Sequence, residues 1–289
     1  MNKINKLILD FACMMADEIH ARAVLLYVDV SFEPPVGRCD SSCFDMVFVT
    51  KGDAELPDHF KEAGTVLNIP DVNLTRVGQI KIAVTKGIAL GLFKKGDKLV
   101  CLTGIPRFGY LDSVFIIDVG KEFEILTSES ITDITEGVYP EVFGAVLNLA
   151  LELAAQGREG RKVGTIFILG DVDKVLQLSR QMIINPFAGY SEEERNILNP
   201  ELKETIKEFS AIDGAFVIKE NGALVTAGRH LNAALEGKDF PQGLGSRHIA
   251  AAGMTSVTHA IAIVLSESTG SVSIFKNGKR FVSIEKPIE

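Results

Sequence analysis

One stretch near the C-terminus decides how the chain is interpreted: Leu244-Gly-Ser-Arg-His-Ile-Ala-Ala-Ala-Gly253, then Thr258-His-Ala260, the apolar run 261–265 and Ser266-Glu267. Its first half combines glycines, a small polar residue, two basic side chains and an alanine-rich segment, which predicts a turn followed by a short helix. Its second half is a run of β-branched and aliphatic residues, which predicts a buried strand.

The turn and the helix start have the features of an anion site. Gly243 and Gly245 permit a tight backbone turn, and Ser246 is expected to cap the helix. Arg247 and His248 fall in the first helical turn, where unpaired N–H groups and the helix dipole favour phosphate. An Arg-His pair after a glycine turn is also typical of an ordinary solvated helix start, so this pattern alone leaves both interpretations open.

A second element lies upstream and makes the phosphate interpretation more specific. Asp213-Gly-Ala215 precedes the apolar strand 216–218, which turns at Asn221-Gly222 and returns as 223–227. Asn-Gly between two apolar runs predicts a β-hairpin. Asp before Gly is also ordinary turn chemistry, so the pair of motifs says more than either one by itself.

Together these motifs resemble those of the diadenylate cyclase family, in the same order along the chain. The matching segments are Asp213-Gly-Ala215, Gly245-Ser-Arg-His-Ile-Ala-Ala251, Thr258-His-Ala260 and Ser266-Glu267. The resemblance covers about the last half of the chain, upstream to the strand at 164–171. With the N-terminal half described below, the chain looks like the archaeal type of these enzymes.

The sequence departs from the family pattern at four positions: Ser246 for Thr, Ile249 for the second Arg of Arg-His-Arg, His259 for Asp, and Ser268 for what is often Glu. Serine keeps the hydroxyl group. Isoleucine cannot replace a guanidinium that would hold phosphate through two hydrogen bonds. Phosphate binding is therefore expected to depend on Arg247, His248 and backbone amides.

The resemblance implies that the protein condenses two ATP molecules into cyclic di-AMP and two pyrophosphates with Mn²⁺ or Mg²⁺. It implies Asp213 as catalytic metal ligand, Glu267 as a second metal-side carboxylate, and Arg247 and His248 as catalytic residues that hold the triphosphate. The further ATP-binding residues it implies are Gly214, Ala215, His230, Leu231, Gly245, Ser246 and Ser266. For His230 the alternative is an exposed loop histidine that contacts no nucleotide.

The composition of the chain limits the classes of protein to which it can belong. The chain has 289 residues, of which 46% are hydrophobic and 24% charged, and a formal net charge of −8. This acidic balance argues against general nucleic-acid binding, which needs clustered Lys and Arg. No apolar stretch approaches the ~20 residues that span a bilayer, and residues 1–6 open a helix rather than a signal peptide. We therefore expect a cytoplasmic protein that does not bind membranes.

In the first half, strands alternate with helices, which indicates an α/β domain with a mostly parallel sheet. Leu7, Ile8, Phe11, Met15 and Ile19 recur at helical spacing. The other expected helices are 57–63 and 75–90, with Thr75 as cap, and the expected strands are 23–30, 45–50, 65–69, 98–103 and 113–119. The segments 75–84 and 96–104 resemble the C-terminal domain of pyruvate kinase, and we expect a role in regulation or assembly.

A polar stretch at 121–139 suggests a domain boundary, which we place between 125 and 126. Residues 1–125 are then the three-layer-like α/β domain, and 126–289 a diadenylate cyclase domain with a mixed sheet flanked by helices. The elements expected in the second domain are a helix from Pro140 to before Gly157, a strand at 163–169, a helix at 172–180 and an amphipathic segment that begins with a cap at Ser191.

Two further expectations concern function. The product is a ring with two-fold symmetry, but each chain carries only one Asp-Gly-Ala motif and one Arg-His pair. We therefore expect a homo-oligomer in which two catalytic domains face each other. The alternatives are a regulatory protein that binds ATP or cyclic di-AMP and has lost catalysis through Ile249, and a nucleotidyltransferase that uses another acceptor.

Overall fold

The computed structural model describes residues 3–29, 43–52, 56–105, 108–121, 134–232 and 245–286. The chain divides into two compact units, Met1–Thr132 and Asp133–Glu289, and each is described by itself. The boundary expected between 125 and 126 and the residues Gly243 and Leu244 lie outside the described ranges. The domain limits 1–125 and 126–289 therefore stay predictions.

Unit 1 is built on a five-stranded sheet in the order β3-β2-β1-β4-β5. Its strands are β1 (Ala23–Tyr27), β2 (Asp45–Lys51), β3 (Thr65–Ile69), β4 (Lys98–Ile105) and β5 (Tyr110–Asp118). The first four pair in parallel, and β5 closes one edge antiparallel to β4. The expected mostly parallel sheet is confirmed. The last strand begins earlier than the expected 113–119.

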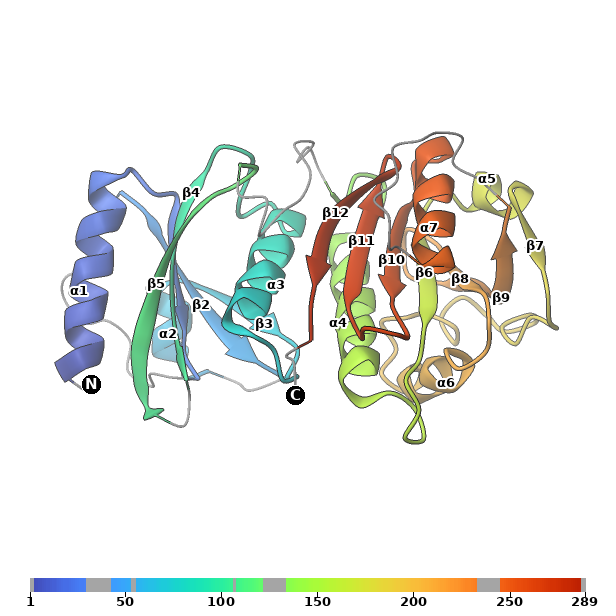
Figure 1. Ribbon diagram of the computed structural model, residues 1–289, viewed down its shortest axis with the longest axis horizontal. Helices are drawn as coiled ribbons and strands as arrows, with labels where there is room; N and C mark the ends of the chain where they lie inside the picture. The colour runs from blue at the N-terminus through green and yellow to red at the C-terminus, as the bar shows by residue number, and fades with distance from the viewer. Residues whose placement is uncertain are drawn as a thin grey trace. The chain divides into compact units, whose positions relative to one another are not determined.

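Helices cover both faces of this sheet (Figure 1). They are α1 (Lys3–Glu18), α2 (Asp58–Ala63) and α3 (Arg76–Ala89). The buried side of α1 packs with Leu26, Phe48 and Leu102 in one apolar cluster, and α3 lies on the opposite face. Thr75 caps α3 as expected, because its Oγ1 accepts a hydrogen bond from Gly78 N at 2.9 Å.

Unit 2 is built on a seven-stranded sheet in the order β12-β11-β10-β6-β8-β9-β7. Its strands are β6 (Thr165–Leu169), β7 (Ser179–Gln181), β8 (Ala215–Ile218), β9 (Leu224–Leu231), β10 (Ile261–Leu265), β11 (Val272–Lys276) and β12 (Lys279–Ile284). The β6 and β8 pair is parallel and the other pairs are antiparallel. The sheet is mixed, as expected.

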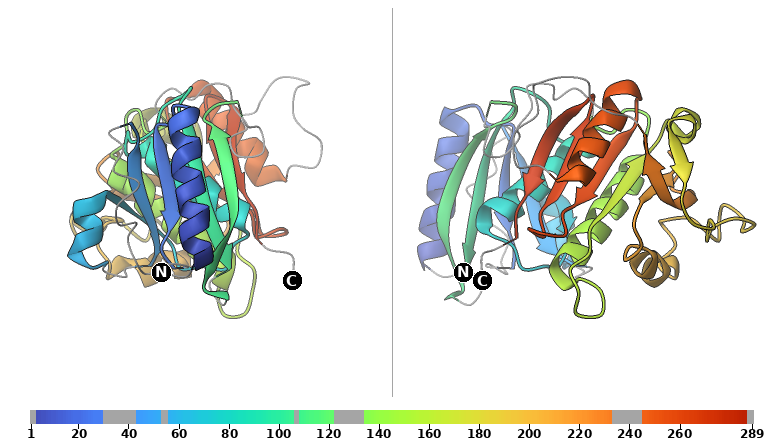
Figure 2. Two further views of the ribbon diagram at one scale, coloured as in Figure 1. Left: turned by 90° about the vertical axis from the view of Figure 1, so that its left-hand side faces the viewer. Right: turned by 45° about the vertical axis from the view of Figure 1, so that its right-hand side comes forward.

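Two longer helices pack on opposite faces of this second sheet (Figure 1). The helices of unit 2 are α4 (Pro140–Gln156), α5 (Val172–Gln177), α6 (Leu202–Phe209) and α7 (Ser246–Val257). Pro140 occupies the start of α4 as expected, where its missing N–H costs nothing. Ala251, Ala252 and Met254 of α7 join the sheet residues in a common core. The second view in Figure 2 shows α7 in front of the sheet.

Two expected helices were wrong in extent. The helix 172–180 ends at Gln177, and the next residues form the edge strand β7 against β9. Ser191 and Glu194 do exchange capping hydrogen bonds, at 2.8 and 3.3 Å, but the segment after them is a series of turns and α6 begins at Leu202. The reason is tertiary: Ile197 N donates to Gly222 O of the hairpin at 2.8 Å, so the backbone pairs there instead of continuing a helix.

The strands β11 and β12 were not anticipated. They form a hairpin that turns at Asn277 and Gly278, both with positive φ. Asn-Gly is the same hairpin signal that was used at 221–222, so the sequence contained a usable indication. None of the helices in the described ranges combines the length and the hydrophobicity that crossing a bilayer requires.

Candidate functional site

Three segments that are distant in sequence meet at one end of the second sheet. In the parallel pair of β6 and β8, Ile166 lies opposite Ala215, so the residues just before these strands, Gly164 and Asp213, leave the sheet at the same end. In the antiparallel pair of β6 and β10, Thr165 lies opposite Leu265. Residues that follow β10, including Glu267, therefore reach this end as well.

Arg247 connects two of these segments. Its guanidinium donates to Asp213 Oδ1 at 2.9 Å through Nη2 and to Glu267 Oε2 at 3.1 Å through Nη1. The Asp213 side chain is 86% exposed. Such exposed pairs contribute little to stability, so the arrangement is better explained as a polar site than as a fold-stabilising contact.

Gly164 lies directly beneath this charged group. A Cβ atom at Gly164 would come within 2.7 Å of Arg247 Nη1 and 2.8 Å of Glu267 Cβ. Glycine is therefore required here by close approach rather than by an unusual φ. From the sequence, Gly164 was expected only as part of a strand.

Helix α7 begins one residue earlier than expected. Gly245 is the N-cap, its carbonyl accepts hydrogen bonds from His248 N at 3.0 Å and Ile249 N at 3.3 Å, and Ser246 is the first helical residue. No side chain caps this end. The expectation that Ser246 caps the helix is wrong, because glycine already adopts the extended N-cap conformation. The hydroxyl of Ser246 is left beside the first-turn amides, in a position suited to an anion.

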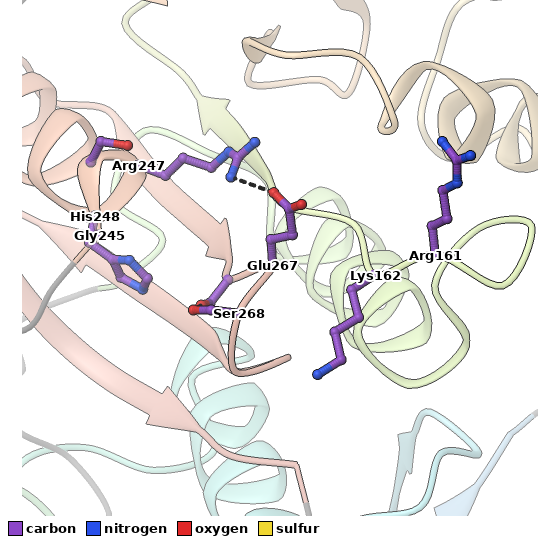
Figure 3. Close-up of a pocket in the computed structure, with 9 residues that line it drawn as sticks. Arg161, Lys162, Gly245, Arg247, His248, Glu267 and Ser268 are labelled. Atoms are coloured by element: carbon purple, nitrogen blue, oxygen red, sulfur yellow. Dashed lines mark hydrogen bonds and ion pairs between the residues drawn. The ribbon is translucent and has the colours of Figure 1, made fainter.

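A pocket of about 700 Å³ opens beside the start of α7 (Figure 3). Its volume is in the range of small-molecule sites. The lining residues are Arg161, Lys162, Gly245, Ser246, Arg247, His248, Ser266, Glu267 and Ser268. In Figure 3 the guanidinium of Arg247 and the carboxylate of Glu267 point toward each other at the pocket. The structure thus brings together six of the residues predicted from sequence and adds three.

Arg161 and Lys162 were not predicted from the sequence as site residues. They lie on the turn between α4 and β6, where Gly157 and Gly160 have positive φ. In the described part of the chain neither side chain has a hydrogen bond or ion pair. By contrast, Arg158 on the same turn is paired with Glu204 at 3.0 Å and with Glu208. The basic Gly-Arg-Lys run before a strand was the available signal.

His248 occupies a more buried position than a simple phosphate ligand would need. Its side chain is buried and its ring lies edge-on to Phe275, with 5.9 Å between ring centroids. Burial lowers the pKa of the imidazole below its ordinary value of 6.5, and the charge of Arg280 lowers it further. His248 is therefore neutral at pH 7. It can offer a hydrogen bond at the pocket wall but no positive charge.

Ser266 and Ser268 form the hydroxyl side of the pocket. Their Oγ atoms are 3.3 Å apart, and Thr269 N donates to Ser266 Oγ at 3.4 Å. Ser266 was predicted to contact ATP. Ser268, at a position where the family often has Glu, was noted only as a departure, and it lines the pocket.

Two predicted ATP-binding residues lie in the hairpin and have structural environments of their own. Gly214 has φ 120°, and a Cβ atom there would come within 2.7 Å of the backbone of Gly228 on β9. Glycine is thus required at position 214 because the backbone there lies close to the neighbouring strand β9. Ala215 is fully buried in the core of unit 2. Their contacts with a nucleotide stay predictions.

His230 and Leu231 do not line the described pocket. They are consecutive residues of β9, so their side chains point to opposite faces of the sheet. His230 is exposed, with Nδ1 3.0 Å from Asn232 Oδ1, while Leu231 packs in the core. One pocket cannot receive both side chains directly from this strand.

Among the described residues, no three His, Cys, Asp or Glu side chains gather as a metal site made entirely by the protein would require. Asp213 and Glu267 nevertheless supply carboxylate oxygens on either side of one guanidinium. Mg²⁺ commonly takes one or two carboxylates and completes its coordination with substrate phosphates and water. The donor set present therefore fits a divalent cation that binds together with a nucleotide.

Comparisons with known proteins cover both halves of the chain. The family described as "DisA bacterial checkpoint controller nucleotide-binding" matches residues 152–280. The family described as "Probable sensor domain DacZ_P" matches residues 5–127. The likeness of this first half to pyruvate kinase stays a prediction.

Relatives in two archaea are similar over most of the chain. A diadenylate cyclase of Methanocaldococcus jannaschii is 37% identical over 202 residues, 69% of this chain and 64% of the relative. A diadenylate cyclase of Haloferax volcanii is 35% identical over 233 residues, 79% of this chain and 83% of the relative. The cyclic di-AMP synthase CdaA of Bacillus subtilis is 41% identical over 66 residues, 23% of each chain. This chain thus spans a little less than two thirds of the M. jannaschii relative.

Proposed function

The chain belongs to the diadenylate cyclase family, and on this basis we propose that it condenses two ATP molecules into cyclic di-AMP and two pyrophosphates. The observation that carries the proposal is the position of Arg247. It stands at the start of α7 and reaches both Asp213 and Glu267 at the edge of a ligand-sized pocket.

The pocket has the charge that a nucleoside triphosphate requires. Arg161, Lys162 and Arg247 contribute three cations, and the first turn of α7 contributes backbone N–H groups. A guanidinium can hold phosphate through two hydrogen bonds, whereas the lysine ammonium acts as a point charge. We assign Arg247, Ser246 and the backbone amides to the phosphates near the reacting phosphorus, and Arg161 and Lys162 to the leaving pyrophosphate.

Arg247 also affects whether the carboxylates of the acidic residues are available to a metal ion. Phosphate oxygens compete with the carboxylates of Asp213 and Glu267 for the same guanidinium. A triphosphate that takes over the hydrogen bonds of Arg247 leaves the carboxylate of Asp213 available. Asp213, with Glu267 as a second carboxylate, would then hold Mg²⁺ or Mn²⁺, which supplies charge neutralisation at the phosphates and lowers the pKa of the ribose hydroxyl.

In the proposed reaction the ribose 3′-oxygen of one ATP forms a bond to the α-phosphorus of the other, and the bond from that phosphorus to pyrophosphate breaks. The proton of the 3′-hydroxyl leaves as the new bond forms, and Asp213 is our candidate to accept it. His248 lines the pocket, and we assign it a hydrogen bond to the bound nucleotide. The main contribution of the protein is positioning and charge stabilisation, as in other phosphoryl-type transfers.

The product has two-fold symmetry, and each chain carries one set of these residues. Two copies that face each other with their pockets would present each 3′-oxygen to the α-phosphorus of the facing nucleotide. We therefore propose that a homodimer of catalytic units is the smallest active species.

The direct test is to incubate the full chain with ATP and Mn²⁺ or Mg²⁺ and to identify the products by mass. Cyclic di-AMP and pyrophosphate in a ratio of one to two support the proposal. ATP binding without any product would instead support the regulatory binding protein suggested by Ile249. Transfer of AMP only to another added acceptor would support a different nucleotidyltransferase.

A further inference from the structure

Helix α1 carries a second apolar face that stays exposed among the described residues of its own unit. Asn5, Leu9, Ala12, Cys13 and Ala16 are its buried residues. On the other side Ile4, Leu7, Phe11 and Met14 are 45%, 60%, 54% and 71% exposed. These four residues, which we call the α1 stripe, are spaced by three, four and three positions. That is the spacing at which side chains align along one face of a helix and form a helix-helix seam.

The charges beside the α1 stripe are arranged in an unusual order. Lys3 and Lys6 are exposed in the first turns, and Asp17 and Glu18 are exposed in the last. The first turn has no acidic residue and the last turn has no basic one. Basic residues at the N-terminus and acidic residues at the C-terminus oppose the helix dipole instead of compensating it. Within α1 alone this distribution is unfavourable.

The same distribution is favourable for an antiparallel neighbour of identical sequence. Lys3, Lys6, Asp10 and Asp17 all fall on one flank of the α1 stripe by helical spacing. In an antiparallel pair this flank of one helix runs beside the same flank of the other. The basic N-terminal half then lies along the acidic C-terminal half of the second copy, and each helix end meets charges that compensate its dipole.

A parallel pair would lack this complementarity. The flank would then face the opposite flank of the second copy, where Ile8 and Met15 supply no charge. In the described part of the chain, Lys3, Lys6 and Asp17 have no ion pair or hydrogen bond through their side chains. They are therefore free to pair between copies. The first view in Figure 2 shows α1 in front of its own sheet.

We propose that α1 is a self-association surface that packs antiparallel against α1 of a second copy of this chain, with Leu7 and Phe11 at the centre of the contact. Four stripe residues are far fewer than the roughly 20–30 that each side of a standard stable interface contributes. The contact is therefore weak by itself and adds to other contacts between copies. The inference concerns assembly through unit 1 and does not rest on the proposed catalytic activity.

The test measures self-association of the full chain by sedimentation velocity over a range of concentrations. Phe11→Gln should raise the dissociation constant of the assembly at least tenfold. The matched control is Leu90→Gln, which removes an exposed apolar side chain at the end of α3, on the opposite face of the sheet. A strictly monomeric wild-type chain, or equal effects of Phe11→Gln and Leu90→Gln, would overturn the proposal.

Charge reversal tests the antiparallel direction. Lys3→Glu and Asp17→Lys should each weaken association, because each places like charges side by side in the pair. An equimolar mixture of the two variants should restore it, since every contact in the mixed pair is again between opposite charges. The chain that carries both changes should also associate as the wild type does. Lack of restoration in both cases would exclude the antiparallel arrangement.

Discussion

Arg247 Nη2 donates a hydrogen bond to Asp213 Oδ1 at 2.9 Å, although 34 residues separate them in the sequence. Through Nη1 the same guanidinium reaches Glu267 at 3.1 Å. One cation thus pairs with both carboxylates that are proposed to bind a divalent metal ion. This links phosphate binding to the availability of the proposed metal ligands.

Asp213→Asn should abolish cyclic di-AMP formation and leave the fold intact. Asparagine keeps the size of the side chain but removes the charge that attracts a hard cation. Because the exposed ion pair contributes only ~0.2–1 kcal/mol, the free energy of unfolding should change little. Product analysis by mass and urea unfolding measure the two effects. Near-normal turnover in this variant would rule out Asp213 as the metal ligand.

Arg247→Ala should weaken ATP binding and reduce the rate. A charge-assisted hydrogen bond contributes ~1.5–3 kcal/mol, which corresponds to about 10-fold to 150-fold in affinity. Ile249 offers no second guanidinium to compensate. Arg247→Lys is the companion variant, and it should recover only part of the loss because an ammonium cannot bind through two parallel hydrogen bonds. Unchanged ATP affinity in Arg247→Ala would refute the assignment.

The double change Arg161→Ala and Lys162→Ala should raise the KM for ATP without lowering stability. Neither side chain has a partner in the described structure, so the fold loses nothing when they are removed. Binding of AMP, which lacks the leaving phosphates, should be unchanged. Lys203→Ala is a suitable control, because Lys203 pairs with Glu152 and does not line the pocket. Equal losses for AMP and ATP would argue against a contact with the pyrophosphate.

His248 should make the free energy of unfolding depend on pH below neutrality. Its pKa in the folded state lies below the ordinary 6.5, so folding favours the neutral ring. The stability that it contributes is fully present above pH 6.5 and is lost as the pH falls below that value. Urea unfolding between about pH 5 and pH 7.5 should show a steeper decline for the wild type than for His248→Gln. Identical pH profiles would contradict the buried neutral histidine.

Specific activity should rise with enzyme concentration over the range in which copies associate. One chain has one set of reacting groups, so a monomer cannot close the ring in one step. Parallel sedimentation and rate measurements provide the comparison. A chain that stays monomeric under assay conditions and forms cyclic di-AMP at a constant specific rate would show that a facing pair is not required.

The residue types of the candidate site were largely accessible from the sequence, because the motifs that carry them are local. Glycine, serine, arginine and histidine before an alanine-rich run predict a helix start suited to anions wherever that helix lies. The hairpin at Asn221-Gly222 and the mostly parallel first sheet are likewise local or periodic signals. The extent of α5 and the start of α6 were not accessible, since neighbouring strands take over the backbone hydrogen bonds there.

The motifs in the sequence determined which groups are available: two carboxylates and one guanidinium in a helical turn. Only the tertiary structure decided which of them meet. Strand pairing brings Asp213, Gly164 and Glu267 to one end of a sheet. The fold also brings Lys162 to this pocket from the turn before β6, and it places the side chains of His230 and Leu231 on opposite faces of the sheet. The physical reason is that side-chain type is local, whereas the register of β6 with β8 and β10 is set by burial of the whole sheet.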